Sequence, residues 1–209
     1  DVYKRQVMNI AVRLLRLLAD ADVRPGIVES YAMDQEDAEV VVALASLLHD
    51  VGISIHRDDH ESFSLFLADA KLRTLLPEVY GPREETIVRS EILHAIISHR
   101  SGGRPLTLEA GVVRIADALD MAKGRSRIPF EAGSLSIHSV SAAAVESVSI
   151  EAGEEHPIRI TVELSNSAGL FQLDQLFREK LKGSTLESYL ELHAKLGDEE
   201  KRLLTDFKL

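Results

Sequence analysis

The sequence predicts a mainly α-helical core followed by a small α+β appendage. From the N-terminus to Gly124, apolar residues recur at helical spacing between breaks made by proline and glycine. After Gly124, apolar and polar residues instead alternate in Glu146–Glu151 and Ile158–Leu164, as they do in half-buried strands. We therefore expect a helical domain over residues 1–129 and an appendage over residues 130–209.

The predicted helices of the core begin and end at residues that favour those positions. Asp34, with the acids that follow it, is typical of a helix N-cap, and Pro82 suits the first turn of a helix. Gly52 ends one helix, and Gly102–Gly103 ends another. The expected helices are Val7–Ala19, a short helix within Pro25–Tyr31, Glu36–His49, His60–Leu72, Arg83–His99 and Leu108–Met121, with Ile53–Asp59 as a charged loop.

The appendage is expected to contain a β-hairpin and helical segments. The turn-rich stretch Ala152–Pro157 separates the two alternating segments, which predicts a hairpin that needs a packing partner for stability. Leu170–Leu181 is a candidate amphipathic helix. Glu187–Leu196 is compatible with either a strand or a helix, and Glu199–Phe207 is expected to be helical.

The composition argues against nucleic-acid binding. The chain has 209 residues and a net charge of −10, whereas a protein that binds duplexes without sequence preference normally has a basic surface. Aromatic residues make up 5% and tryptophan is absent, which disfavours a base-stacking platform for single strands. A small anionic substrate remains compatible with this charge, because a metal ion and a few arginines can reverse the local potential.

Cysteine usage and hydropathy indicate where the protein acts. The sequence has no cysteine, which excludes disulfides, thiolate metal ligands and a cysteine nucleophile. This absence fits a reducing compartment, and we expect a cytoplasmic protein. No apolar run approaches the roughly 20 residues of a membrane span, and the N-terminus has no signal-peptide pattern.

The doublet His49-Asp50 is the strongest functional signal in the chain. It follows the almost purely apolar run Val40–Leu48, so both side chains stand at the edge of a buried element. Burying an imidazole beside a carboxylate is costly unless a charged or hydrogen-bonding group meets them. A divalent metal ion is one such group, since both side chains are good ligands. The alternative is that the pair only caps the end of a helix.

More histidines and a second isolated acid follow the doublet. Five of the eight histidines fall between positions 49 and 99. Asp117 lies within the apolar pattern of the last core helix, and Asp120 lies three residues later on nearly the same face. A buried carboxylate without a partner would neutralise, so a partner is implied. The candidates besides the doublet are His56, His60, His94, His99 and Asp117.

The order of these residues resembles that of the HD-domain superfamily of metal-dependent phosphohydrolases. The resemblance is carried by Leu48-His49-Asp50-Val51-Gly52 and by Ile115-Ala116-Asp117-Ala118-Leu119-Asp120, and it covers roughly residues 7–128. It implies an HD-type helical bundle. It also implies a divalent ion (Mn, Mg, Fe, Ni, Co or Zn) held by His49, Asp50 and Asp117. It favours Asp117 over Asp120 as the ligand.

The resemblance also suggests roles for the remaining candidates. Asp50 would act both as a ligand and as a proton acceptor, while His60 and His99 would bind a second metal or contact phosphate. Arg125 and Arg127 follow the Asp117 helix, and their guanidinium groups suit phosphate oxygens, although basic residues there also favour the helix dipole. His94 is a further phosphate candidate or, alternatively, a core histidine, and His56 is expected in solvent.

One departure from the family pattern leaves the function open. HD enzymes have a further histidine ligand on the first helix, whereas residues 1–48 contain no histidine. That ligand would belong near residues 2–6, and the chain starts at Asp1 without an initiator methionine. We predict hydrolysis of a nucleotide or other small phosphoester by metal-activated water. The alternatives are a catalytically impaired module that binds a nucleotide or partner protein as a regulator, or an appendage that forms a homodimer through its strand edges.

Overall fold

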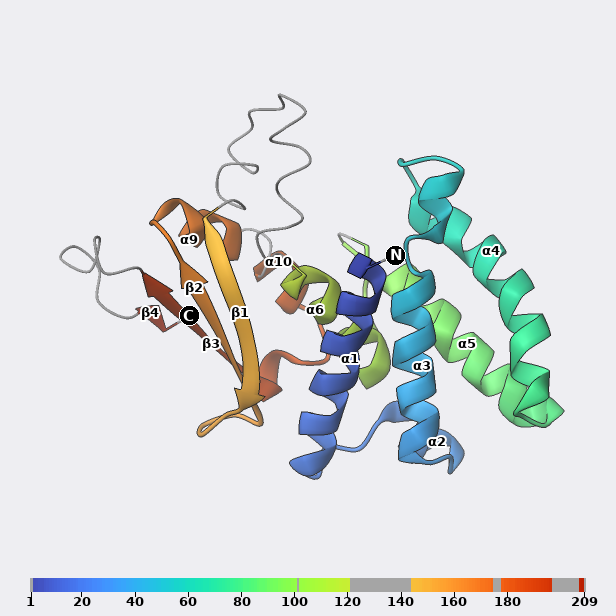
Figure 1. The fold of residues 1–209 in the computed structure, drawn as a ribbon. Coiled ribbons are helices and arrows are strands. Elements are labelled where there is room, and N and C mark those ends of the chain that lie inside the picture. The colour runs from blue at the N-terminus through green and yellow to red at the C-terminus, as the bar shows by residue number, and fades with distance from the viewer. Residues whose placement is uncertain (1, 101, 121–143, 175–177, 197–206, 209) are drawn as a thin grey trace.

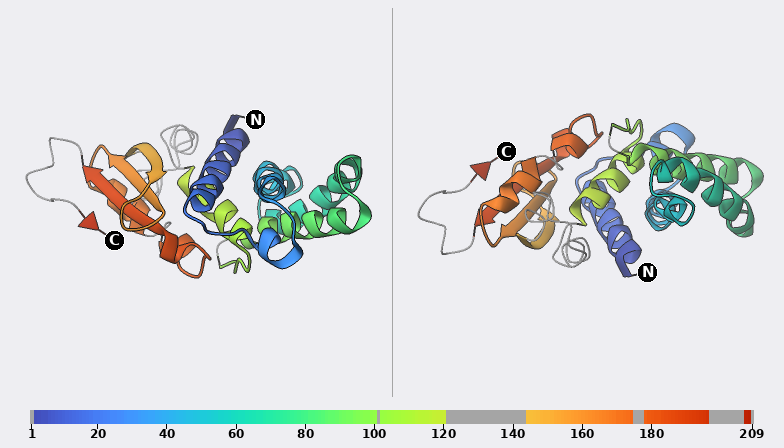
Figure 2. Two further views of the ribbon diagram at one scale, coloured as in Figure 1. Left: turned by 90° about the horizontal axis from the view of Figure 1, so that it is seen from below. Right: turned by 90° about the horizontal axis from the view of Figure 1, so that it is seen from above.

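Helices and a β-sheet lie side by side in this chain. The computed structural model describes residues 2–100, 102–120, 144–174, 178–196 and 207–208. The sheet lies on one side and most of the helices on the other, with α1 and α6 between them (Figures 1 and 2). The helices are α1 (Val2–Asp20), α2 (Gly26–Tyr31), α3 (Gln35–Leu48), η1 (Val51–Ser54), α4 (His60–Leu75), η2 (Leu76–Glu78), α5 (Pro82–Ser98), α6 (Leu108–Leu119), α9 (Ala168–Gln172), α10 (Arg178–Leu181) and η4 (Glu187–Tyr189). The strands are β1 (Val145–Ala152), β2 (Ile158–Leu164), β3 (Leu190–Leu196) and β4 (Phe207–Lys208).

The helical part is a bundle with an aliphatic interior. Helix α1 packs on α3 and α6, α3 packs on α5, and α5 packs on α6 and α4. Leu14, Val41, Ile92 and Ile115 are fully buried where these helices meet, and each such side chain contributes about 1.5–3 kcal/mol to folding. Helices α3, α5 and α6 all finish at the end of the bundle where α1 starts (Figure 1). This shared end gathers side chains that are far apart in the sequence.

The helix boundaries follow the signals in the sequence. Asp34 caps α3 through a capping box, in which the backbone N–H of Asp37 donates to the Asp34 carboxylate at 3.1 Å and Asp37 accepts from the Asp34 N–H at 3.0 Å. Pro82 occupies the first turn of α5. Part of the loop expected at Ile53–Asp59 is instead the 3-10 helix η1. Its Gly52 is buried against α4, where its N–H donates to Ser64 Oγ at 2.8 Å.

The appendage contains the predicted hairpin within a sheet of order β1-β2-β3-β4. Strands β1 and β2 pair antiparallel, while β2 and β3 pair parallel, with α9 and α10 lying between them along the chain. Both β1 and β2 contact α1, which is the packing partner that the hairpin requires. The mainly α fold with a hairpin-containing α+β appendage is therefore confirmed.

Some predictions for the appendage differ from the structure or fall outside it. Within the helix expected at Leu170–Leu181, the residues up to Gln172 belong to α9 and Arg178–Leu181 form α10, while residues 175–177 lie outside the described part of the chain. Glu187–Leu196, which was compatible with a strand or a helix, forms η4 and then β3, because Leu190–Leu196 pairs with β2. The predicted boundary near residue 130 and residues 199–206 of the last expected helix lie outside the described residues.

A buried arginine connects the helical part to the appendage. Arg114 of α6 is 2% exposed. Its Nε donates to the carbonyl of Lys180 at 2.8 Å, and its Nη2 donates to that of Glu179 at 3.0 Å. Its Nη1 donates to the carbonyls of Ser98, Arg100 and Gly103, where α5 ends. These bonds hold α10 against the ends of α5 and α6.

No helix in the described part of the chain is long and apolar enough to cross a membrane.

Candidate functional site

Five residues singled out in the sequence meet at the shared end of the helical bundle. His49 caps the C-terminus of α3 and Asp50 follows it, His60 opens α4, His99 caps α5, and Asp117 lies in the last turn of α6. His49 Nε2 lies 3.4 Å from Asp50 Oδ2 and 3.6 Å from Asp117 Oδ1. Asp50 Oδ1 lies 3.1 Å from His60 Nε2 and 3.8 Å from His99 Nε2. Four separate helices therefore supply one cluster of imidazoles and carboxylates.

Each of the three histidines is oriented by a backbone carbonyl three residues earlier in the chain. The Nδ1 atoms of His49, His60 and His99 face the carbonyl oxygens of Ser46, Arg57 and Ile96, in that order, at 2.7, 2.9 and 2.5 Å. A proton on Nδ1 satisfies this contact and leaves Nε2 as the atom available to a ligand. This is the arrangement usual for metal-binding histidines, whose other ring nitrogen is fixed by a second group.

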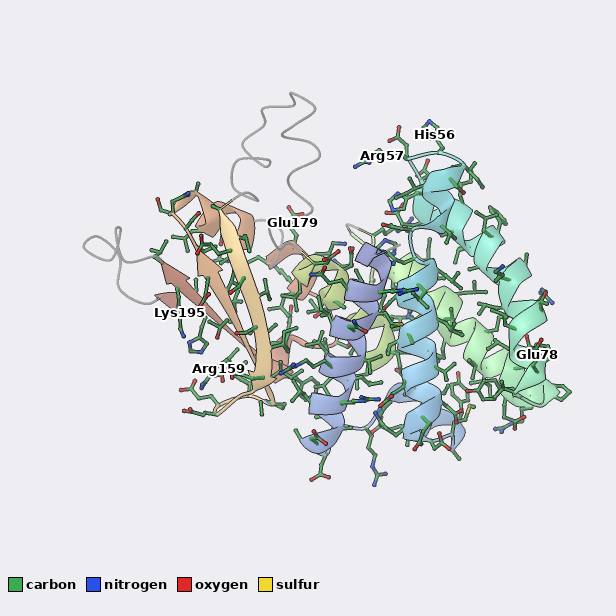
Figure 3. All side chains as sticks on the ribbon, viewed as in Figure 1. His56, Arg57, Glu78, Arg159, Glu179 and Lys195 are labelled. Carbon is green, nitrogen blue, oxygen red and sulfur yellow. The ribbon has the colours of Figure 1, made fainter. Side chains whose placement is uncertain are left out.

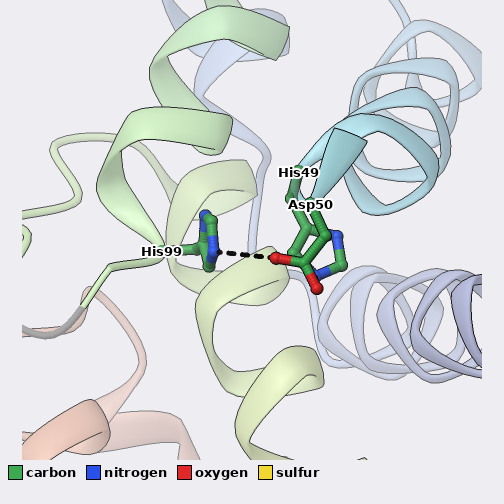
Figure 4. A group of neighbouring side chains, drawn as sticks. All are labelled: His49, Asp50 and His99. Atoms are coloured by element: carbon green, nitrogen blue, oxygen red, sulfur yellow. Dashed lines mark ion pairs between the residues drawn. The ribbon is translucent and has the colours of Figure 1, made fainter. Parts of the chain in front are cut away.

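His49 Nε2 is the atom that most directly indicates a cation-binding site. It is buried and has no hydrogen-bond partner among the described residues, although Asp50 and Asp117 stand next to it. Two ligand atoms that each lie about 2.1 Å from one ion are at most about 4.2 Å apart. The separations of 3.4, 3.6 and 3.8 Å within the cluster meet this limit. His49, Asp50 and His99, drawn in Figure 4, have the composition and spacing to hold a metal ion.

The electrostatics of the cluster also favour a cation. Burial opposes the charged form of His49, but the carboxylates of Asp117 and Asp50 outweigh it and raise the pKa of His49. Burial likewise opposes ionisation of Asp117, yet His49, Lys180 and His99 hold the pKa of Asp117 well below its ordinary value. Burial lowers the pKa of His99 to about 4, so its ring is neutral at pH 7. The cluster thus combines an ionised carboxylate at Asp117 with a neutral imidazole at His99, which are the forms that bind a metal ion.

A second group of ligand atoms adjoins the first. His60 and Glu61, from the first turn of α4, lie with His99 so that one ligand atom from each falls within 4.8 Å of the others. His99 belongs to both groups, and its ring meets that of His49 edge-on with centroids 4.8 Å apart. His60 is the most exposed of the three histidines, with 22% of its side chain accessible. The second group therefore faces the open side of the site.

Other candidates lie away from the cluster or outside the described residues. His94 faces another direction, because its Nε2 accepts a hydrogen bond from the Leu106 N–H at 3.0 Å. His56 is exposed in the loop before α4 and points outward, as Figure 3 shows. Arg125 and Arg127 lie outside the described part of the chain.

Two residues of the site were not among the sequence candidates. Glu61 directly follows His60, and that adjacency was the only signal for it. Lys180 comes from α10 in the appendage, and its Nζ lies 3.2 Å from Asp117 Oδ2. Lys180 and Asp117 are 63 positions apart in the sequence, so no local pattern could link them.

Comparison with known proteins fits this geometry. The family model for the HD domain matches residues 5–122, more than half of the chain. The chain belongs to the HD-domain family. HD domains form a superfamily of metal-dependent phosphohydrolases that bind divalent ions, which agrees with the His/Asp cluster.

A relative extends the similarity beyond the HD domain. The uncharacterized protein MJ1020 of Methanocaldococcus jannaschii is 41% identical to this HD-domain chain over 194 residues, which is 93% of this chain and 75% of that protein. Because this match reaches far past residue 122, the appendage is shared as well as the HD domain.

Proposed function

We propose that this HD-domain protein is a metal-dependent phosphohydrolase that cleaves a nucleotide or another small phosphoester. The observation that carries the proposal is the buried Nε2 of His49, which has no hydrogen-bond partner in the described residues and lies between the carboxylates of Asp50 and Asp117. His49, Asp50 and His99 have the spacing to hold the ion, and Asp117, whose Oδ1 lies 3.6 Å from His49 Nε2, would be a further ligand. When bound, a divalent ion supplies Lewis acidity that polarises phosphoryl oxygens and lowers the pKa of water.

Asp50 and His60 are placed to handle the proton of the attacking water. Acceptor oxygens face both ring nitrogens of His60, namely the Arg57 carbonyl at 2.9 Å and Asp50 Oδ1 at 3.1 Å. The His60 ring and the Asp50 carboxylate are therefore close enough for a proton to pass between them. In the proposed reaction, Asp50 Oδ1 accepts the proton that water loses, and His60 Nε2 can pass it to the leaving oxygen.

The exposure of the site supports a small substrate that approaches from the α4 side. The side chains of His49 and His99 are 2% and 4% exposed, whereas those of Asp50 and His60 are 18% and 22% exposed. The reacting phosphate would therefore meet Asp50 and His60 first.

With no cysteine to form disulfides, the chain is suited to a reducing compartment, and we propose that it acts in the cytoplasm.

The test is phosphate release from a panel of nucleotides and small phosphoesters with Mn, Mg, Fe, Ni, Co or Zn. We expect turnover by the wild type with at least one ion and loss of about 100-fold or more in the Asp117→Asn variant, as for removal of a metal ligand or its support. The exposed His56→Ala variant is the control and should retain activity. Absence of release by the wild type across the panel, under conditions where it binds the ion, would contradict the proposal.

The second candidate is a module that binds a nucleotide or a partner protein as a regulator. It is favoured by one observation, the absence of any histidine in residues 1–48, where the family pattern places a further ligand. Nucleotides would then raise the melting temperature of the metal-loaded protein without being hydrolysed. Thermal melting and phosphate release, measured on the same samples, separate the two functions.

A further inference from the structure

The appendage places a lysine at the metal site of the HD domain. Lys180 Nζ lies 3.2 Å from Asp117 Oδ2 and also donates to the carbonyl oxygen of His99. Lys180 and His49 contact different oxygens of the same carboxylate, because Asp117 turns Oδ1 toward His49 and Oδ2 toward Lys180. An ammonium group has three hydrogens, so among the described residues one donor remains for another acceptor.

The position of Lys180 is fixed by its backbone as well as by its side chain. The buried guanidinium of Arg114 binds the carbonyls of Glu179 and Lys180 and, through Nη1, those at the end of α5. The segment that carries Lys180 is therefore held to the same helix, α6, that carries Asp117. Figure 1 shows α10 beside α6, between the sheet and the bundle. A side chain held in this way loses little freedom when it binds a ligand.

The charge of the site indicates a role for this ammonium. The carboxylates of Asp50 and Asp117 together neutralise a divalent ion, so these three groups leave no excess positive charge for a phosphate. Lys180 supplies that excess at the edge of the cluster, with 15% of its side chain accessible. The chain as a whole carries a net charge of −10, so an anionic substrate depends on such local cations.

We propose that Lys180 binds a phosphoryl oxygen of the substrate, so that the appendage completes the active site of the HD domain. This inference rests on the proposed function for the identity of the ligand. The appendage is then a functional part of the site, and a helical domain without α10 would have the metal ligands but lack this phosphate contact.

The experiment is calorimetric titration of inorganic phosphate into the Mn²⁺-loaded full chain. We expect Lys180→Met to weaken phosphate binding by about tenfold or more, as for loss of a charge-assisted hydrogen bond. Lys180→Arg should retain most of the affinity. Lys182→Met is the matched control, because Lys182 is exposed two residues away. Titration of Mn²⁺ into each phosphate-free variant checks that the ion still binds.

Two results would overturn the inference. In the first, Lys180→Met binds phosphate as tightly as the wild type. In the second, it loses affinity for Mn²⁺, which would make Lys180 a support for Asp117 instead of a phosphate ligand.

Amine acetylation of the wild type, followed by mass spectrometry, avoids any folding defect of a variant. Phosphate added to the Mn²⁺-loaded protein should protect Lys180 and leave Lys182 reactive, and equal reactivity of Lys180 with and without phosphate would contradict the inference.

The outcome also separates this inference from the proposed function. A wild type that binds phosphate through Lys180 but hydrolyses no phosphoester would contradict the hydrolase and leave the phosphate site standing. If the wild type hydrolyses a phosphoester and Lys180→Met keeps both the KM and the phosphate affinity of the wild type, the result would contradict the phosphate-binding role of Lys180 and leave the hydrolase function supported.

Discussion

His60 Nε2 lies 3.1 Å from Asp50 Oδ1, although Asp50 follows α3, His60 opens α4 and the 3-10 helix η1 separates them. The approach depends on Gly52, which lies between them in the sequence and packs directly on the first turns of α4. A Cβ atom at this position would overlap the backbone of His60 and Ser64. The glycine that the sequence suggested as a helix end is therefore required for the distance between two site residues.

Gly52→Ala should lower the stability and loosen the site together. The added methyl has no space against backbone atoms, so we expect a loss of about 3 kcal/mol, at the upper end of typical overpacking costs. Urea unfolding measures this loss, and Mn²⁺ titration of the folded variant should show weaker binding. Gly81→Ala is the control, since there a Cβ meets only the end of the Glu84 side chain. Equal unfolding midpoints for the two variants would contradict this account.

His49→Ala should abolish the stabilisation that a divalent ion gives. A ligand at 100 times its dissociation constant stabilises the folded state by about 2.7 kcal/mol, so the melting temperature of the wild type should rise with added Mn²⁺. The variant lacks the buried Nε2 that faces both carboxylates and should show little or no rise. His56→Ala, an exposed histidine nearby, should behave as the wild type. If added Mn²⁺ raises the melting temperature of His49→Ala as much as that of the wild type, His49 is not a ligand of the ion.

The sequence predicted the parts of this protein that depend on local pattern. The N-cap at Asp34, the proline that opens α5 and the alternating strands of the hairpin are set by neighbouring residues, and all three occur in the structure. The His/Asp candidates were identifiable because polar residues interrupt apolar helices at His49, His99 and Asp117. Their convergence follows from three helices that end at one end of the bundle.

Contacts between distant segments could not be predicted in this way. Lys180 reaches Asp117 from α10, which packs on α6 and lies in the sequence between the parallel strands β2 and β3. Leu170–Leu181 has a helical pattern, but nothing in that pattern indicates that Arg114 of α6 binds the carbonyls of Glu179 and Lys180 in α10. An arginine within Val112–Ile115 was a visible anomaly in the sequence, yet its carbonyl partners come from two distant segments.

Arg114→Met should destabilise the protein by about 3 kcal/mol or more, because hydrogen bonds to a charged group are lost and buried carbonyls are left without donors. The guanidinium is 2% exposed and bonds to the end of α5 and to α10. Arg114→Lys should recover only part of the loss, since one ammonium cannot reproduce the forked geometry. The exposed Arg104→Met is the control. Urea unfolding that gave the same free energy for Arg114→Met and Arg104→Met would refute the structural role of Arg114.

The stability of the wild type should fall with rising pH through a buried acid far from the metal site. Glu91 of α5 is 8% exposed, and its Oε2 is buried without a hydrogen-bond partner among the described residues. Burial, and then the negative charge of Glu109, raise the pKa of Glu91 above its ordinary value of 4.5. The folded state therefore keeps this proton at a pH where the unfolded state has lost it. Its contribution to stability is present below about pH 4.5 and is lost as the pH rises through the raised value.

Glu91→Gln removes this titration while keeping the shape of the side chain. The melting temperature of the variant minus that of the wild type should therefore increase between pH 4 and pH 7 in the metal-free protein. Other groups titrate in both proteins and cancel in the difference. Glu78→Gln is the control, because Glu78, the last residue of η2, is exposed to solvent (Figure 3) and its difference from the wild type should stay nearly constant with pH. A Glu91→Gln difference that stays constant or decreases toward pH 7 would mean that Glu91 is not buried as an acid with a raised pKa.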